Sequence, residues 1–290
     1  MPAESVPQPL QRLGRDVEIF EPLEMHRGQI RYAVLDFDGT ISLLRAGWQQ
    51  VMSDQFVRIL REQAPTAESP LQLTAVCRDF ITALTGRQTI YQTIQLEEEI
   101  RKRGGEPLPA ALYKRQYLEL LSDHIHHRVE AVRTGQRPPA DYLLRGTMSL
   151  LKGLTDGGVT CFLASGTDVE FVRQEAELLG VTHFFNGSGS ERIYGALEEY
   201  RKFSKQMIID RILRENSAAG SALAVFGDGY VEIANGRQAK GTAIGVASLE
   251  SGELGWDMWK KSRLAEVGAQ ILVPDWQEAD LLLDYLGIAP

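Results

Sequence analysis

The chain has 290 residues, of which 43% are hydrophobic and 24% are charged, and its formal net charge at pH 7 is −8. These values are typical of a globular chain with a substantial core, and they exclude a disordered one. Nucleic-acid binding needs clustered lysine and arginine, so the acidic balance argues against a nucleic-acid partner. No apolar run approaches the length of a membrane span and the first residues lack a signal-peptide pattern, so we expect no membrane partner and a cytoplasmic location.

The first expected features in chain order are an N-terminal extension and a buried strand. Residues 1–29 begin with a stretch rich in proline and serine, and their pattern assigns them to no element of the core. The run IRYAVLDF, residues 30–37, is short, apolar and partly β-branched, which indicates a buried strand that Gly39 ends.

A long helical segment follows this strand. Helical periodicity runs through residues 48–63, 73–86, 89–105 and 108–132, and no convincing strand interrupts it. A crossover between parallel strands normally needs only about a dozen residues. We therefore interpret residues 45–143 as an inserted helical cap domain.

Strand and helix patterns alternate in the rest of the chain. Apolar runs predict strands at residues 159–165, 183–187, 222–229, 242–248 and 269–275, and helical patterns separate most of them. Such alternation favours a parallel sheet that helices cover on both faces. The predicted fold is α/β: a Rossmann-like parallel-sheet core, formed by residues 30–44 and 144–290, with the inserted α-helical cap.

Acidic side chains stand at the ends of two predicted strands or just after them. Asp36 and Asp38 end the first strand, and Asp228 ends another, with Glu232 four residues further on. The carboxyl ends of parallel strands meet at one edge of the sheet, so these carboxylates are expected to cluster and repel one another. A hard divalent cation with oxygen ligands would relieve the repulsion, and magnesium is the expected ion.

Groups suited to a phosphate follow the second and later strands. Ser165 and the Gly166 amide end one strand, and Thr167-x-x-Glu170 has the spacing of a capping box that opens a helix. Lys205 begins a later helix and would supply a compact cation. An exposed lysine at a helix start is ordinary, and Lys202 lies three residues earlier, so the pattern leaves a surface role for Lys205 open.

The order of these motifs resembles the haloacid dehalogenase superfamily of phosphohydrolases. The motifs are DFDGT, an apolar run ending in serine, a lysine that opens a helix, and GDGYVE after another apolar run. The resemblance covers residues 30–42 and 145–275, and the insert is similar to that superfamily's helical cap. The segment TGRQTIYQ is similar, more loosely, to the substrate-facing part of phosphoglucomutase-like caps, which would place Arg87 and Gln88 near the substrate.

The resemblance implies a role for each matching residue. Asp36 would be the nucleophile that forms an aspartyl-phosphate, and Asp38 the general acid and base. Magnesium would be bound by Asp36, Asp228 and the carbonyl of Asp38. The phosphoryl group would be held by four residues: Thr40, Ser165, Gly166 and Lys205.

Glu232 departs from the family pattern. An aspartate is more common at this position, and the longer glutamate side chain could reach the metal through water or lie on the surface. Direct contact between Glu232 and the metal therefore stays open.

Three functions remain compatible with the sequence. The first is a magnesium-dependent phosphatase acting on a small phosphomonoester, such as a sugar phosphate or a phosphoglycolate-like compound, because a large cap can close over a small ligand and exclude water. The second is a phosphomutase on a hexose phosphate, which would use the same residues. The third is a non-catalytic regulatory protein, although such a chain would tolerate the loss of residues that are all present here. The sequence indicates neither the substrate nor the oligomeric state.

Overall fold

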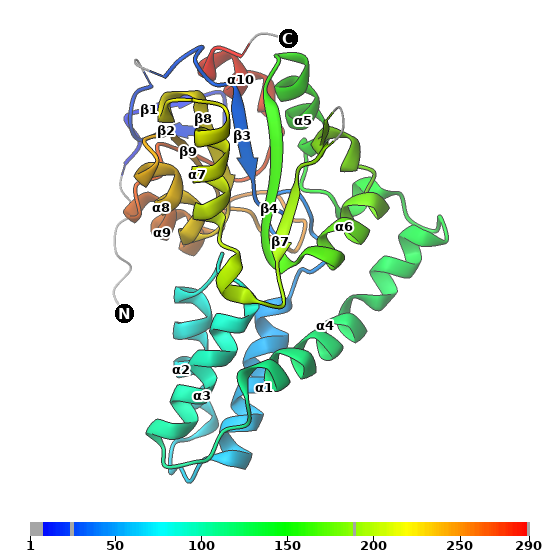
Figure 1. The fold of residues 1–290 in the computed structure, drawn as a ribbon, viewed down its shortest axis with the longest axis vertical. Coiled ribbons are helices and arrows are strands. Elements are labelled where there is room, and N and C mark those ends of the chain that lie inside the picture. The colour runs from blue at the N-terminus through cyan, green and yellow to red at the C-terminus, as the bar shows by residue number, and fades with distance from the viewer. Residues whose placement is uncertain (1–7, 24–25, 188–189, 289–290) are drawn as a thin grey trace.

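One mixed sheet organises the molecule (Figure 1). The computed structural model describes residues 8–23, 26–187 and 190–288, so residues 1–7 of the expected extension lie outside the described part. The sheet strands in these ranges are β1 (Gln11–Leu13), β2 (Val17–Ile19), β3 (Tyr32–Leu35), β4 (Thr160–Asp168), β7 (Ile193–Ala196), β8 (Leu223–Gly227), β9 (Thr242–Val246) and β10 (Ile271–Val273). They lie in the order β1-β2-β10-β9-β8-β3-β4-β7, and the six from β10 to β7 are parallel. The predicted α/β Rossmann-like fold is confirmed.

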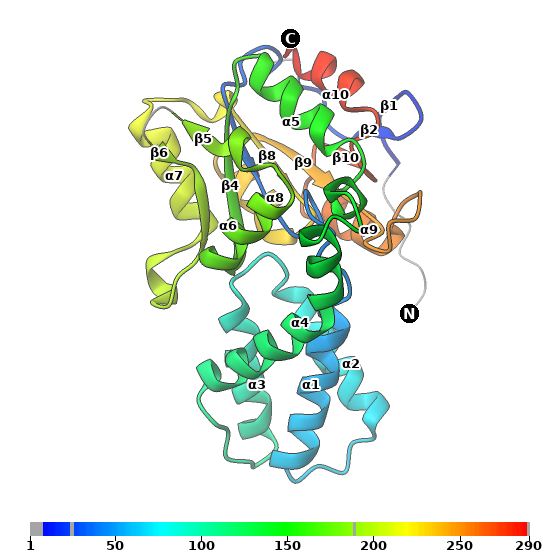
Figure 2. The ribbon, with the colours of Figure 1, turned by 90° about the vertical axis from the view of Figure 1, so that its right-hand side faces the viewer.

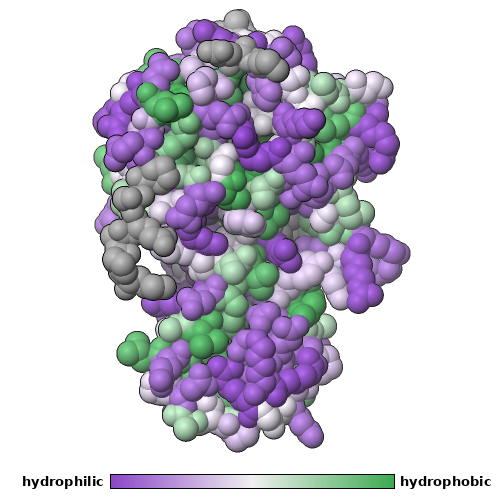
Figure 3. All heavy atoms as spheres, turned by 90° about the vertical axis from the view of Figure 1, so that its left-hand side faces the viewer, coloured by the Kyte–Doolittle hydropathy of each residue, from purple (hydrophilic) through white to green (hydrophobic). Residues whose placement is uncertain are grey.

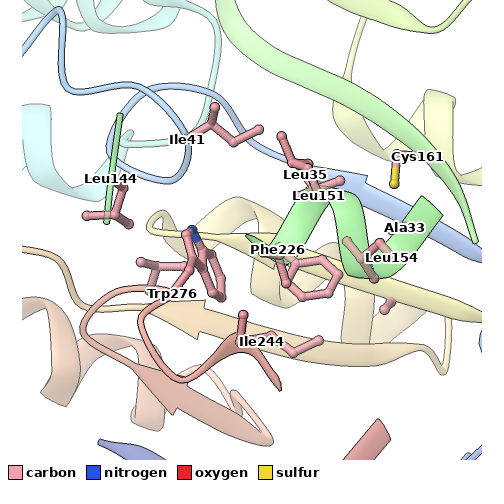
Figure 4. Packing of buried hydrophobic residues seen from close by; sticks show 14 of the residues in the cluster. Ala33, Leu35, Ile41, Leu144, Leu151, Leu154, Cys161, Phe226, Ile244 and Trp276 are labelled. Carbon is pink, nitrogen blue, oxygen red and sulfur yellow. The ribbon is translucent and has the colours of Figure 1, made fainter. Parts of the chain in front are cut away.

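The central strands are apolar on both sides because helices cover both faces of the sheet. On one face, Ala33 and Leu35 pack with α5 (Thr147–Asp156), α6 (Val169–Leu178) and α10 (Ala279–Leu286). On the other face, Val34 packs against α7 (Lys205–Glu215), while α8 (Tyr230–Gln238) and α9 (Met258–Glu266) cover β9 and β10. Figure 4 shows the first core, in which Phe226 and Trp276 lie side by side with ring centroids 5.8 Å apart.

Four helices between β3 and β4 form a separate bundle with its own apolar core. They are α1 (Trp48–Gln63), α2 (Pro70–Ala83), α3 (Thr89–Lys102) and α4 (Ala110–Arg133). Phe56, Leu96 and Tyr113 are fully buried in that core. Figures 1 and 2 show the bundle below the sheet, with the carboxyl end of β3 pointing toward it. The helices agree with the expected helical insert, while the division into a core and a cap domain stays a prediction.

The N-terminal segment adds two short strands to the sheet. β1 and β2 form an antiparallel hairpin, and Ile19 of β2 pairs with Ile271 of β10. Glu18 is 1% exposed and pairs with Arg12 and with Lys261 of α9. Three-residue strands carry too little alternation to be recognised in the sequence, so this hairpin was not predicted.

The strand predicted at residues 183–187 is wrong. Thr182–Phe185 is a 3-10 turn, and only Asn186–Gly187 is extended, paired with Ser190–Glu191 in a small separate sheet. Phe184 and Phe185 are buried against the core, so their apolar character reflects packing of a turn rather than a strand. The edge strand is instead β7, which the sequence did not predict.

One face of the molecule is mainly polar. Figure 3 shows polar side chains over much of one face, with apolar patches between them. No helix in the described ranges is both long and apolar enough to cross a membrane.

A buried tryptophan supports the loop that follows β3. Trp276 is 1% exposed, and its Nε1–H donates to the carbonyl oxygen of Thr40 at 2.8 Å. Trp276→Phe keeps most of the apolar volume but leaves that carbonyl without its donor, so the free energy of unfolding should fall by about 1–3 kcal/mol in urea denaturation. Trp259→Phe is the control, because Trp259 is 49% exposed; it should change stability by no more than about 0.5 kcal/mol. Equal effects of the two substitutions would contradict the support role.

Candidate active site

Seven of the predicted site residues line one cavity: Arg87 from the bundle, and six at the carboxyl edge of the sheet. These six come from the ends of β3, β4 and β8 and from the start of α7: Asp36, Asp38, Ser165, Gly166, Lys205 and Asp228. The bundle lines the cavity from the other side, through residues 85–87 and through side chains of α1, α3 and α4. The cavity volume is about 60 Å³.

The turn after β3 is anchored to β8 and lies close to the Asp228 carboxylate. The Asp36 N–H donates to the Phe226 carbonyl at 2.9 Å, which anchors Asp36 to β8. Gly39 has a φ of 74°, and a Cβ there would lie 2.3 Å from Oδ2 of Asp228. Glycine is therefore required both by the left-handed backbone and by the close approach of the Asp228 carboxylate.

Asp36 is paired with Lys205. The Nζ of Lys205 lies 2.6 Å from Oδ1 of Asp36 and also bonds Glu232, and all three side chains are buried. Ser204 caps α7 by accepting a hydrogen bond from the Met207 N–H at 3.1 Å, which places Lys205 at the first helical position. Burial raises the pKa of Asp36; Lys205 opposes this, and the negative charge of Asp228 adds to it.

The surface alternatives for Lys205 and Glu232 are therefore wrong. Lys202, three residues earlier, is the exposed lysine and pairs with Glu199. Glu232 contacts Lys205 rather than solvent, and its Oε2 has no hydrogen-bond partner among the described residues. Glu232 thus positions the lysine, and no direct role in metal binding follows from these contacts.

Asp38 lies among polar groups that differ from those around Asp36. Its Oδ2 accepts from the Thr167 hydroxyl at 2.8 Å and from the Ser165 hydroxyl at 3.5 Å. Burial raises the pKa of Asp38 to about 7; Arg45 opposes the rise, while Glu175 and Asp36 add to it. A carboxyl group with a pKa near neutrality can both donate and accept a proton, as a general acid and base must.

The capping box predicted at Thr167 does not form. α6 has Asp168 at its N-cap position without a side-chain capping bond, and the Thr167 hydroxyl turns to Asp38 instead. The sequence reasoning therefore assigned Thr167 to the helix, whereas its contact belongs to the site.

Arg45 and Glu175 form a buried ion pair beside Asp38 that sequence reasoning missed. The Arg45 Nε lies 3.0 Å from both carboxylate oxygens of Glu175, and 3.8 Å from Oδ1 of Asp38. Arg45 comes just before α1 and Glu175 from α6, so 130 residues separate them in the chain. No local pattern could have joined them.

Lys260 and Glu250 form a second missed group, next to Asp228. The Lys260 Nζ lies 2.7 Å from Oδ2 of Asp228 and 2.8 Å from Oε1 of Glu250. Burial lowers the pKa of Lys260, but the charges of Asp228 and Glu250 outweigh it and raise that pKa above its ordinary value. The lysine is therefore a cation held within the acidic site.

Gly166 lines the cavity, whereas Thr40 does not. Thr40 is fully buried behind it, and its hydroxyl has no hydrogen-bond partner among the described residues. Gly166 faces the bundle, and a Cβ there would lie 2.5 Å from the carbonyl oxygen of Arg87. Glycine at 166 therefore lets the bundle approach the end of β4 closely.

Arg87 and Gln88, the two residues of the bundle that the sequence placed near the substrate, have different surroundings. Arg87 lines the cavity, whereas Gln88 is buried and donates from Nε2 to the carbonyls of Tyr200 and Phe203, at 2.7 Å each. Gln88 thus ties the bundle to the segment just before Lys205. An ion pair between Lys114 of α4 and Asp168, at 2.5 Å, also joins the bundle to the sheet domain.

The acidic donors are chemically suited to magnesium. The part of the chain that the structure describes contains no group of three His, Cys, Asp or Glu side chains arranged for a metal. Magnesium, however, is usually held by one or two carboxylates and keeps several waters. Asp36 and Asp228 line the same cavity, and the negative charge of Asp228 raises the pKa of Asp36, so a cation bound between their oxygens would relieve this repulsion.

Comparison with solved structures identifies the fold. A predicted phosphoglycolate phosphatase from Haemophilus somnus 129PT is 13% identical, with 88% of this chain and 97% of that chain covered and a TM-score of 0.56. A beta-phosphoglucomutase from Clostridium difficile is 12% identical, with 89% and 97% covered and a TM-score of 0.56. A HAD family hydrolase from Deinococcus radiodurans R1, with bound phosphate and sodium, is 14% identical, with 90% and 98% covered and a TM-score of 0.50.

Sequence comparison adds nothing to this likeness. No protein-family model matches the chain, and no curated protein matches it. The fold is similar to that of solved structures that include a haloacid dehalogenase-like protein, in agreement with the resemblance that the motif order indicated. At these identities the likeness shows the fold alone.

The Gln88 contacts predict a local effect on the segment before Lys205. Gln88→Ala removes both donors to the carbonyls of Tyr200 and Phe203, so amide hydrogen exchange in residues 199–206 should become several-fold faster. Lys114→Met is the matched control, because it breaks a different link between the bundle and the sheet, the ion pair with Asp168, without touching this segment. Exchange is measured by mass spectrometry. Unchanged exchange in the Gln88 variant would contradict the conclusion that Gln88 holds the segment before Lys205.

Proposed function

We propose that the protein is a magnesium-dependent phosphatase that hydrolyses a small phosphomonoester through an aspartyl-phosphate intermediate. The observation that carries the proposal is the meeting of Asp36, Asp38, Lys205 and Asp228 in one cavity. Residues far apart in the chain contribute a nucleophile, a proton carrier, a phosphate-binding cation and a metal ligand. The motif order and the fold of the solved phosphatases support the same reaction.

In the first step, a carboxylate oxygen of Asp36 attacks phosphorus while the bond to the leaving oxygen breaks. Asp38 donates its proton to that oxygen, which suits a carboxyl group whose pKa is raised to about 7. Lys205 already lies 2.6 Å from Asp36, so it can hold a phosphoryl oxygen as the new bond forms. The Ser165 hydroxyl and the Gly166 amide, at the end of β4, are the further donors proposed for that group.

In the second step, water cleaves the aspartyl-phosphate. Asp38, now a carboxylate, accepts a proton from the water as it attacks phosphorus, and the bond from phosphorus to Asp36 breaks. Bound to Asp36 and Asp228, magnesium would supply positive charge for the transferring oxygens. Arg45, 3.8 Å from Asp38, stabilises the carboxylate form between the two steps.

The size of the cavity favours a small substrate and a moving cap. Pockets for small ligands usually measure about 300–1,000 Å³, whereas this cavity measures about 60 Å³. We infer that the bundle α1–α4 acts as a cap that must separate from the sheet to admit substrate and then closes to exclude water. A sugar phosphate or a phosphoglycolate-like compound fits this scheme better than a macromolecule does. The contacts of Arg87 with substrate belong to the same proposal.

A phosphomutase on a hexose phosphate is the second candidate. The likeness to a beta-phosphoglucomutase and the closed cavity both favour it, because excluding water lets a sugar hydroxyl accept the phosphoryl group. The non-catalytic alternative is weaker, since the complete residue set would be unnecessary in such a protein.

Substitution of the two aspartates tests the reaction. Asp36→Asn should lower hydrolysis of p-nitrophenyl phosphate with Mg²⁺ by at least about 1,000-fold, because the nucleophile is lost. Asp38→Asn should lower it by about 100- to 10,000-fold, the usual contribution of a general acid and base. Both variants should keep the wild-type circular dichroism spectrum. Substantial activity in Asp36→Asn would remove the nucleophile assignment.

A matched pair of lysines provides the control. Lys205→Met should abolish most activity, whereas Lys202→Met, which removes an exposed lysine three residues away, should leave it near the wild-type value. Equal activity in the two variants would contradict the role of Lys205.

The acceptor of the phosphoryl group separates the two candidate functions. With a hexose 1-phosphate and Mg²⁺, a phosphatase should release inorganic phosphate in an amount equal to the substrate consumed. A mutase would instead convert most of the substrate to the isomeric sugar phosphate. Phosphorus NMR of the product mixture distinguishes the outcomes, and predominant isomerisation would replace the phosphatase proposal with the mutase.

A further inference from the structure

Lys260 occupies a position that helix stability does not explain. It lies in the first turn of α9, where the Asp257 carboxylate caps the helix by accepting from the N–H groups of Trp259 and Lys260 at 3.0 and 2.9 Å. The positive end of the helix dipole disfavours a lysine in a first turn. The side chain is nevertheless 6% exposed and points to the acidic site.

The ammonium group of Lys260 bridges two carboxylates. It lies 2.7 Å from Oδ2 of Asp228 and 2.8 Å from Oε1 of Glu250. The same Oδ2 of Asp228 is the oxygen nearest the Gly39 backbone. One oxygen of Asp228 is therefore already taken by a cation that belongs to the protein.

Hydrogen bonds fix the loop that carries Glu250, the second partner of Lys260. The Ser248 hydroxyl donates to the Gly39 carbonyl at 2.7 Å, and the Asp257 N–H donates to the Ala247 carbonyl at 2.9 Å. These bonds fix both ends of the loop that carries Glu250 next to the turn that follows Asp36. The bridge is thus part of the fold.

We propose that Lys260 is a resident counter-ion of Asp228, which neutralises the acidic site when it is empty and competes with the divalent cation for the same carboxylate. The inference rests on the proposed function, which includes a bound Mg²⁺. It adds Lys260 as a residue that sets the affinity of the site for that ion. The physical reason is charge: a unit positive charge a few ångströms from a dication opposes its binding, even at the high effective dielectric constant of a protein.

Removing the charge should tighten cation binding. Lys260→Met should bind Mg²⁺ about tenfold more tightly than the wild type in isothermal titration calorimetry. Its melting temperature without metal should be lower, because Asp228 and Glu250 lose their partner, and Mg²⁺ should raise it by more than it raises that of the wild type.

Lys261→Met is the matched control. Lys261 is the next residue of α9, is similarly buried, and pairs with Glu18 at 2.7 Å, away from Asp228. Glu18 keeps Arg12 as a second partner. This variant should lose stability but keep the wild-type affinity for Mg²⁺.

Glu250→Gln tests the inference without leaving a buried carboxylate unpaired. It removes the second partner of Lys260, so the ammonium should bind Asp228 more strongly and the Mg²⁺ dissociation constant should rise several-fold. Opposite shifts in Lys260→Met and Glu250→Gln, with none in Lys261→Met, are the expected result.

Two results would overturn the inference. The first leaves the proposed function intact, and the second removes its magnesium assignment as well. If the wild type binds Mg²⁺ but Lys260→Met binds it equally or more weakly, Lys260 is no competitor, and the proposed function stands. If neither the wild type nor any variant binds Mg²⁺ while aryl-phosphate hydrolysis persists in EDTA, the magnesium assignment fails together with this inference.

Discussion

The repulsion among buried carboxylates at one edge of the sheet is the constraint on which the site depends. Asp36 and Asp228 line one cavity, and Asp36 and Glu232, both buried, share the ammonium group of Lys205. Burial and the charge of Asp228 both disfavour the ionised form of Asp36. Lys205 from α7 and Lys260 from α9 supply the compensating charges. Two of the three helices on one face of the sheet, α7 and α9, therefore do more than bury it, because their first turns carry the cations that make the acidic edge stable.

The bundle completes the site from the other side. Gly166 permits its backbone to approach β4, and Gln88 fastens it to the segment before Lys205. The bundle is thereby connected, through that segment, to Lys205, which contacts Asp36. A site built from two units in this way can be dry and preorganised when closed, which strengthens electrostatic interactions with a transferring phosphoryl group.

The two aspartates of the DFDGT motif are one residue apart but have different surroundings. Asp36 is paired with a lysine, whereas Asp38 accepts hydroxyl hydrogen bonds and has a pKa of about 7. In a regular strand residues 36 and 38 would point to the same face. β3 ends at Leu35, so the turn that follows gives the two side chains different partners and separates a nucleophile from a proton carrier. The proposed chemistry needs that difference.

Much of this was readable from local pattern, because strand ends in a parallel sheet share one edge whatever the rest of the chain does. Local pattern predicts the apolar runs at β3, β8 and β9 and the helical period of residues 48–63. It also places four site residues at strand ends: Asp36, Asp38, Ser165 and Asp228. Tertiary structure alone decided the Arg45–Glu175 pair, the Lys260 bridge to Asp228, the turn of Thr167 toward Asp38, and the addition of the N-terminal hairpin to β10. Each of these joins segments that are distant in the chain or too short to have a period, so their partners are set by packing in three dimensions.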